Sequence, residues 1–187
     1  MFTLESTAFK NEGKIPENYA EKNKDSPPLR WRNVPKGTKS FALTVTDPDT
    51  PEALGLPRVF VQWMVYNIPA AVTSLPKGAS PSGKLPPAAR ELNNDAAVFK
   101  IPGFYDKGYI SPWPPDAAHR YVFTLYALKV PTLDIPEAAD YVEFVKRVLP
   151  QTITTATLMG YYGPAKNPLP AYRQVSTQAI PQLPYSE

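Results

Sequence analysis

Proline is the feature of this sequence that most limits its fold, because 24 of the 187 residues are proline and only nine are glycine. Proline lacks a backbone donor and disrupts the interior of helices and of central strands. Since the prolines are spread along the chain, long helices are excluded from most of it, and short extended segments joined by loops are favoured. The sequence therefore predicts a fold dominated by β-strands.

Several runs between the prolines have the pattern of strands. Residues 40–47 alternate between large apolar residues and small or polar ones, which is typical of a half-buried strand. Residues 58–68 are apolar on both faces apart from Gln62, which predicts a central strand containing a buried glutamine. Further strands are expected at residues 2–4, 96–101, 119–130 and 151–162.

The remaining segments predict one helix, one long connection and a tail. Pro136 stands where a first helical turn begins, and apolar residues recur at helical spacing as far as Leu149. Residues 69–95 are expected to form a surface connection that ends in solvated turn residues at 93–95. We expect one domain over residues 1–163, with a proline-rich tail at 164–187 that packs on the domain or extends from it.

Composition excludes several classes of function. The net charge is +3, but the basic residues are scattered, so no nucleic-acid partner is expected. No apolar run approaches the roughly 20 residues of a transmembrane segment. The chain has no cysteine, which fits the cytoplasm, although a trimmed export signal for the periplasm or for secretion is compatible too. There is no metal-binding constellation and no glycine-rich phosphate loop, so we expect neither a metal nor a cofactor.

Two polar segments are candidates for a binding site. The only histidine, His119, opens a strand-like run directly after the proline-rich segment 111–116. Strand alternation points His119 and Tyr121 to the same side. Asp47 and Asp49 lie in an Asp-Pro-Asp-Thr-Pro motif that ends another strand. If the two segments meet in space, they form a polar pocket for a small anion or a carbonyl compound.

Each of these residues also has a purely structural interpretation. A lone histidine at a strand start is more often a hydrogen-bonded residue without a further role. Asp47 and Asp49 precede prolines and are natural turn formers. Tyr121 can be a core residue, and Trp113 can merely cover an edge. From the residue types alone, both interpretations stay open.

Five segments together carry a resemblance to a known family. They are residues 26–31 (SPPLRW), 34–43 (VPKGTKSFAL), 47–51 (DPDTP), 66–69 (YNIP) and 114–128, which contains HRYVFTLYAL. In this order the sequence resembles the phosphatidylethanolamine-binding protein family, in its bacterial and archaeal, Raf kinase inhibitor protein-like branch. The resemblance implies an all-β-dominated, antiparallel Greek-key β-sandwich with one or two peripheral helices and a shallow pocket. Such a pocket takes phosphate, acetate-like anions or a phospholipid head group.

The resemblance also implies which residues form the pocket. The Asp-Pro-Asp motif corresponds to Asp47 and Asp49, and the His-Arg-Tyr motif to His119 and Tyr121. The rim of the pocket corresponds to Ser111, Pro112, Trp113 and Pro114. Family members usually have a second histidine on the central strand, where this chain has Gln62. A glutamine can bind an oxyanion or a carbonyl group, but it does not titrate near pH 7.

Two carboxylates beside a bound anion would repel it, which limits how the pocket can work. The arrangement suits an anion only if Asp47 or Asp49 fixes a protonated His119 or caps backbone amides. A carboxylate on one ring nitrogen would leave the other nitrogen to donate to a ligand oxygen or to relay a proton. We therefore expect one of the two carboxylates to orient His119.

Three functions agree with these observations. The first is binding of a small anion, a phospholipid head group or a related small molecule, in a regulator that inhibits a kinase or protease through its rim. The alternative is an enzyme in which His119, oriented by Asp47, is the general acid or base toward a carbonyl-containing, polyketide-like substrate, with Gln62 or Tyr121 polarising the oxygen. Trp113 offers a flat apolar face to such a ligand. The third is an interaction module that holds a protein partner.

Overall fold

The computed structural model describes residues 1–164 except residues 22–23, 52–53 and 57–58. Its strands are β1 (Thr3–Glu5), β2 (Gly13–Lys14), β3 (Leu29–Arg32), β4 (Ser40–Asp47), β5 (Phe60–Pro69), β6 (Ser74–Leu75), β7 (Arg90–Glu91), β8 (His119–Leu128) and β9 (Thr152–Tyr162). Its helices are α1 (Asp95–Val98) and α2 (Tyr141–Val148), with short 3-10 helices η1 (Glu17–Tyr19) and η3 (Leu149–Gln151). The predicted tail, from residue 165 on, and the predicted strand start at residue 58 lie outside the described residues.

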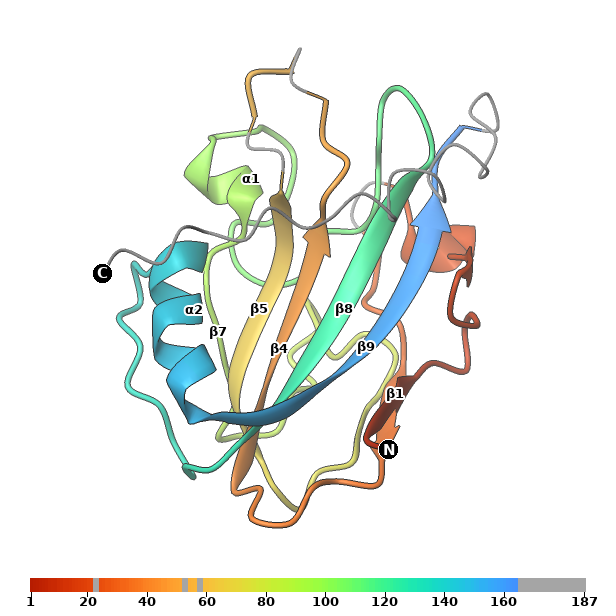
Figure 1. The fold of residues 1–187 in the computed structure, drawn as a ribbon. Coiled ribbons are helices and arrows are strands. Elements are labelled where there is room, and N and C mark those ends of the chain that lie inside the picture. Colours follow the sequence, from red (N-terminus) through yellow and green to blue (C-terminus); the bar gives the residue numbers. More distant parts are fainter. Residues whose placement is uncertain (22–23, 52–53, 57–58, 165–187) are drawn as a thin grey trace, which may run out of the picture.

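Two β-sheets form the framework of the described chain (Figure 1). The larger sheet has the strand order β2-β9-β8-β4-β5-β7, and the smaller one has the order β1-β3-β6. The mostly-β, two-sheet expectation is confirmed, with one exception to antiparallel pairing: β2 pairs with β9 in parallel. β4 lies between β5 and β8. After β5 the chain forms β6 in the smaller sheet, returns to pair with β5 as β7, and then crosses to β8 on the other side of β4.

The central strand β4 is buried on both faces, which corrects the prediction of a half-buried strand. One face carries Phe41, whose ring packs against Trp31 of the smaller sheet with 5.3 Å between centroids. The other face carries Ala42, in the same apolar cluster as Phe144 of α2. All residues of β4 are therefore buried, because α2 covers the face that the alternating pattern assigned to solvent (Figure 1).

Helix α2 is shorter than the predicted segment from Pro136 to Leu149. It begins after Asp140, whose carboxylate accepts a hydrogen bond from the Glu143 amide at 2.8 Å and so caps the helix. The buried side chains of the helix are Phe144 and Val148. The caps, and not the apolar spacing alone, set where this helix starts.

Residues 96–101 do not form the predicted strand, because the short helix α1 occupies Asp95–Val98. The Asn94 side chain caps this helix by accepting a hydrogen bond from the Ala97 amide at 3.2 Å. The Asp95 carboxylate accepts a hydrogen bond from the Val61 amide of β5 at 2.8 Å. Asn94 and Asp95 are buried, so the prediction of solvated turn residues was wrong for these two, whereas Asn93 is exposed as predicted. The connection 69–95 also contains β6 and β7.

Candidate functional site

Asp47 and His119 meet in space although 72 residues separate them in the sequence. Because β4 and β8 are antiparallel neighbours, with Thr46 opposite Val122, the end of β4 lies beside the start of β8. The Asp47 Oδ2 atom lies 2.7 Å from His119 Nδ1, and both side chains are buried. The contact expected between one motif carboxylate and the histidine is therefore present.

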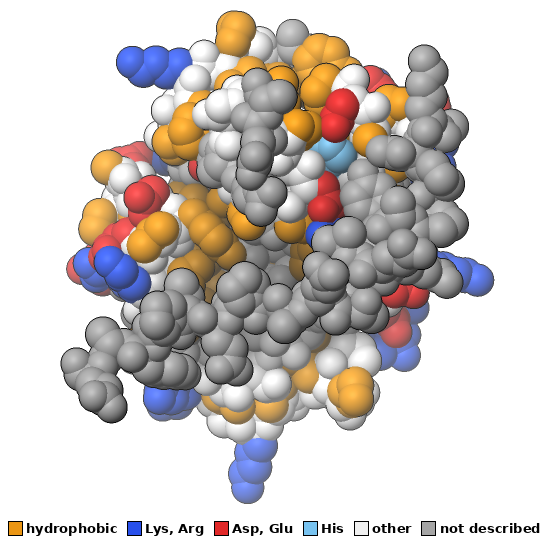
Figure 2. Space-filling view, turned by 45° about the horizontal axis from the view of Figure 1, so that its top comes forward, with side chains coloured by type: hydrophobic (Ala, Val, Ile, Leu, Met, Phe, Trp, Pro, Cys, Tyr) orange, Lys and Arg blue, Asp and Glu red, His pale blue; other side chains and the backbone are white. Residues whose placement is uncertain are grey.

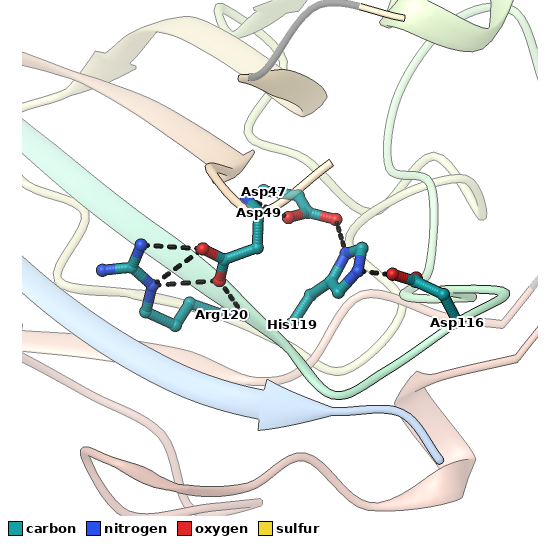
Figure 3. A network of polar contacts seen from close by, with 5 residues as sticks. All are labelled: Asp47, Asp49, Asp116, His119 and Arg120. Atoms are coloured by element: carbon teal, nitrogen blue, oxygen red, sulfur yellow. Dashed lines mark hydrogen bonds and ion pairs between the residues drawn. The ribbon is translucent and has the colours of Figure 1, made fainter. Parts of the chain in front are cut away.

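A second carboxylate contacts the other nitrogen of the same ring (Figure 3). Asp116 Oδ1 lies 2.9 Å from His119 Nε2, and the Asp116 side chain is 47% exposed. Asp116 is not among the site residues predicted from the sequence. Its position three residues before the histidine was the only signal, and nothing in the pattern shows that this loop turns back toward the ring.

The two carboxylates favour the protonated form of His119. Burial alone lowers the pKa of His119, but the hydrogen bond and charge of Asp47, with the charge and hydrogen bond of Asp116, outweigh it and raise the pKa above its usual value. A carboxylate on each ring nitrogen needs a proton on each of them. With both carboxylates ionised, this arrangement favours the imidazolium form of His119.

Tyr121 adds a neutral hydroxyl to this cluster. Burial raises the pKa of Tyr121 far above its usual range, and the nearby charge of Asp47 raises it further. The phenol consequently keeps its proton near neutral pH, and the Asp47 carboxylate is its hydrogen-bond acceptor.

Asp49 is turned away from His119 and forms a separate pair with Arg120 (Figure 3). Its two carboxylate oxygens accept hydrogen bonds from Nε at 2.9 Å and Nη2 at 2.7 Å, and Oδ2 also accepts one from the Arg120 amide at 2.8 Å. The Asp49 amide donates to Asp47 Oδ1 at 2.8 Å. Asp49 does not line the cavity described below, so the carboxylates of the motif occupy different surroundings.

His119 lines a cavity of about 440 Å³ that opens beside the proline-rich loop. In Figure 2 the histidine just reaches the surface between acidic side chains, and apolar side chains surround a hollow nearby. The polar lining residues are Asp47, Thr50, Gln62, Ser111, His119 and Tyr121. The apolar lining residues are Pro51, Leu54, Leu56, Phe60, Ala96, Ile101, Phe104, Ile110, Trp113, Pro114 and Pro115.

The sequence identified the polar lining better than the apolar wall. Of the predicted pocket residues, Asp49 and Pro112 do not line the cavity. The Pro112 carbonyl instead accepts a hydrogen bond from the Glu21 amide at 2.7 Å, which holds the loop against the N-terminal segment. Trp113 is half exposed and packs against Phe104, with 5.7 Å between ring centroids. Most of the apolar wall lies outside the motifs and consists of Leu54, Leu56, Phe60, Ala96, Ile101, Phe104 and Ile110.

Two buried polar atoms in the lining have no hydrogen-bond partner among the described residues. They are the Gln62 side-chain oxygen, on a residue that is 4% exposed, and the Thr50 hydroxyl, on a residue that is 8% exposed. Buried polar groups are nearly always hydrogen-bonded in native proteins. Their presence in this lining provides places where a ligand can bond.

Comparison with protein families matches residues 5–163 to a family described as phosphatidylethanolamine-binding protein. The chain belongs to the phosphatidylethanolamine-binding protein family. Among its relatives, a UPF0098 protein of Methanothermobacter thermautotrophicus is 34% identical over 160 residues, which cover 85% of this chain and 97% of the relative. Such relatives place the chain in the bacterial and archaeal branch of the phosphatidylethanolamine-binding proteins, as expected from the sequence.

Solved structures of phosphatidylethanolamine-binding proteins share the fold. The putative homolog from Chlamydia trachomatis is 34% identical, with a TM-score of 0.75 over 87% of this chain and 97% of that one. Escherichia coli YbcL is 30% identical, with a TM-score of 0.74 over 87% of this chain and 98% of that one. In the described part of the chain, no helix has the length and apolar character needed to cross a membrane.

Proposed function

We propose that the cavity beside the proline-rich loop binds a small molecule whose oxygen-bearing end meets His119. The observation that carries this proposal is the position of the imidazole, which is buried, lies between two carboxylates and lines the cavity. A cationic imidazole donates charge-assisted hydrogen bonds, and an anionic or carbonyl oxygen is a suitable acceptor. Phosphate, a phospholipid head group and an organic acid all supply such an oxygen.

The composition of the wall supports a ligand that also has an apolar body. Ligand pockets commonly combine a mostly apolar lining with a few polar groups that fix the orientation of the ligand. Here Leu56, Phe60 and Phe104 belong to the apolar part, and Thr50 and Gln62 supply polar atoms that have no hydrogen-bond partner among the described residues. The volume of about 440 Å³ lies within the range of known small-molecule sites.

Binding agrees better with this arrangement than general-base catalysis does. Protonated at both nitrogens, the His119 ring has no lone pair with which to accept a proton. In this state the ring can donate a hydrogen bond or a proton. The enzymatic alternative is thereby narrowed to acid catalysis on a carbonyl-containing molecule.

Isothermal titration calorimetry tests the proposal with phosphate, phosphoethanolamine and phenylacetate at millimolar concentration. We expect the parent to bind at least one of them and His119→Gln to lose that binding. Lys107→Gln is the matched control, because it removes a cation that pairs with Glu137 outside the cavity lining. The proposal fails if none of the three binds the parent, or if His119→Gln binds as tightly as the parent does.

A further inference from the structure

Both ring nitrogens of His119 are already occupied by carboxylates of this chain. Asp47 lies 2.7 Å from Nδ1, and Asp116 lies 2.9 Å from Nε2. A ligand oxygen that bonds to the imidazole must therefore replace one of these two side chains.

Asp116 is the carboxylate that can leave. The Asp47 side chain is only 7% exposed, and its other oxygen accepts the Asp49 amide, so displacing it would leave a buried carboxylate without its partner. Asp116 is 47% exposed, and a carboxylate that already contacts water needs little energy to turn fully into it. Asp116 itself does not line the cavity, whereas the adjacent Pro115 and His119 do, so Nε2 is the atom at which a ligand in the cavity would compete with Asp116.

We propose that Asp116 is an internal competitor that occupies the place of the ligand's polar end, and that the ligand which displaces it is an organic monoacid with an apolar body. The proposal rests on the proposed function of the same cavity and adds to it the class of ligand and the residue that limits its affinity.

Charge favours a monoacid over a phosphomonoester. Exchange of the Asp116 carboxylate for a ligand carboxylate leaves the summed charge around His119 unchanged. A phosphomonoester is largely a dianion at neutral pH and adds negative charge beside the buried Asp47. None of the described lining residues is Lys or Arg, and the nearby Arg120 is bonded to Asp49. Nothing described in the lining compensates for the second charge.

The apolar wall favours a monoacid with a body over acetate. An acid with one aromatic ring can place the ring against side chains such as Phe60 and Phe104, and burial of apolar surface adds affinity that acetate cannot gain. A carboxylate also presents two oxygens. The Thr50 hydroxyl, which has no hydrogen-bond partner among the described residues, is a donor in the same lining for the second of them.

Calorimetry on a small set of variants tests the internal competitor. Parent, Asp116→Asn and Asp116→Ala are titrated with phenylacetate at about pH 6, where even an unperturbed imidazole is mostly charged. We expect both substitutions to tighten phenylacetate binding by about three- to tenfold, since a half-exposed ionic competitor is removed. Glu137→Gln removes the same charge from an 84% exposed side chain outside the lining and should leave the affinity unchanged.

The parent is also titrated with phenylacetate, acetate and phosphate at about pH 7. We expect phenylacetate to bind more tightly than either of the others. If phenylacetate binds both Asp116 variants no more tightly than it binds the parent, Asp116 is not an internal competitor. The proposed function still stands in that case, provided that binding is lost in His119→Gln. Phosphate binding more tightly than phenylacetate overturns the monoacid class alone. If none of the three binds the parent, the proposed function itself fails, and this inference fails with it.

Discussion

Two acidic residues of one short motif, Asp47 and Asp49, pair with adjacent residues of β8 and yet form two different structures. Asp47 holds His119, and Asp49 holds Arg120, with a shortest contact of 2.7 Å in each pair. The His119 pair is buried and lines the cavity, whereas neither member of the Arg120 pair lines it. A repeated residue type within a motif therefore does not mean a repeated role.

Strand geometry explains the difference between the two pairs. Successive side chains of a strand point to opposite faces, so His119 and Arg120 leave β8 in different directions. Asp49 binds both the guanidinium group and the backbone amide of Arg120, which fastens the chain after β4 to the start of β8. We interpret the Arg120 pair as a structural clamp that joins the chain after β4 to the start of β8 outside the binding site.

The largest loss of stability is expected from Asp47→Ala. This substitution leaves the buried His119 without its buried partner and removes the oxygen that accepts the Asp49 amide. Loss of one member of a buried ion pair lowers the free energy of unfolding by about 3 kcal/mol. Chemical denaturation measures the change. Asp116→Asn, at the exposed side of the same ring, is the control and should change stability by less than about 1 kcal/mol. Equal effects of the two substitutions would contradict the ranking.

A smaller loss of stability is expected from Arg120→Lys, a substitution that tests the clamp between Asp49 and Arg120. Lysine keeps the charge but cannot donate to both Asp49 oxygens from a planar group, so we expect the free energy of unfolding to fall by about 1 to 2 kcal/mol. Phenylacetate affinity should stay at the parent value when measured on the folded variant. A stable variant that has lost its ligand affinity would place Arg120 in the binding site and remove the distinction between the pairs.

The pH dependence of stability should report the His119 pair. Because the pKa of His119 is raised in the folded protein, its contribution to stability is complete below the unfolded pKa of about 6.5 and is lost as pH rises through the folded pKa. The free energy of unfolding, measured by chemical denaturation at a series of pH values, should therefore fall over this window. His119→Gln should flatten the fall, as no other histidine is present. If the free energy of unfolding falls with pH equally in the parent and in His119→Gln, groups other than His119 cause the fall.

The smallest effect on stability is expected from Trp113→Ala at the rim. Because this side chain is half exposed, its removal should change the free energy of unfolding by less than about 1 kcal/mol. Phenylacetate affinity should nevertheless fall, since Trp113 belongs to the apolar lining. If affinity is unchanged and stability falls strongly, Trp113 is a structural cover and not part of the binding surface.

The sequence predicted best the features that depend on local pattern. The strand 119–130 and the closing strand 151–162 follow from β-branched and aromatic residues, and β8 and β9 lie there. The family motifs predicted that Asp47 and His119 belong to one pocket, and the two side chains are in contact. The segment 96–101 was misjudged because a four-residue helix has too little periodicity to detect. Its N-cap, Asn94, and its first residue, Asp95, look like ordinary turn residues.

Contacts that are set by tertiary packing could not be predicted from the sequence. The apolar pattern of β4 is the same whether its second face meets water or a helix, and only the position of α2 decides this. Asp116 is an ordinary loop residue until the loop turns it back onto His119. Asp49 looks equivalent to Asp47 until strand alternation separates the partners of the two.

The most direct test of this account is nuclear magnetic resonance of the imidazole nitrogens during a pH titration, because a single histidine gives a single set of ring signals. If Asp47 and Asp116 hold His119 as a cation, both ring nitrogens carry protons at pH 6.5, and the ring titrates with a pKa above the usual value of about 6.5. A pKa below that value, or a neutral tautomer with one bare nitrogen at pH 6.5, would contradict the account.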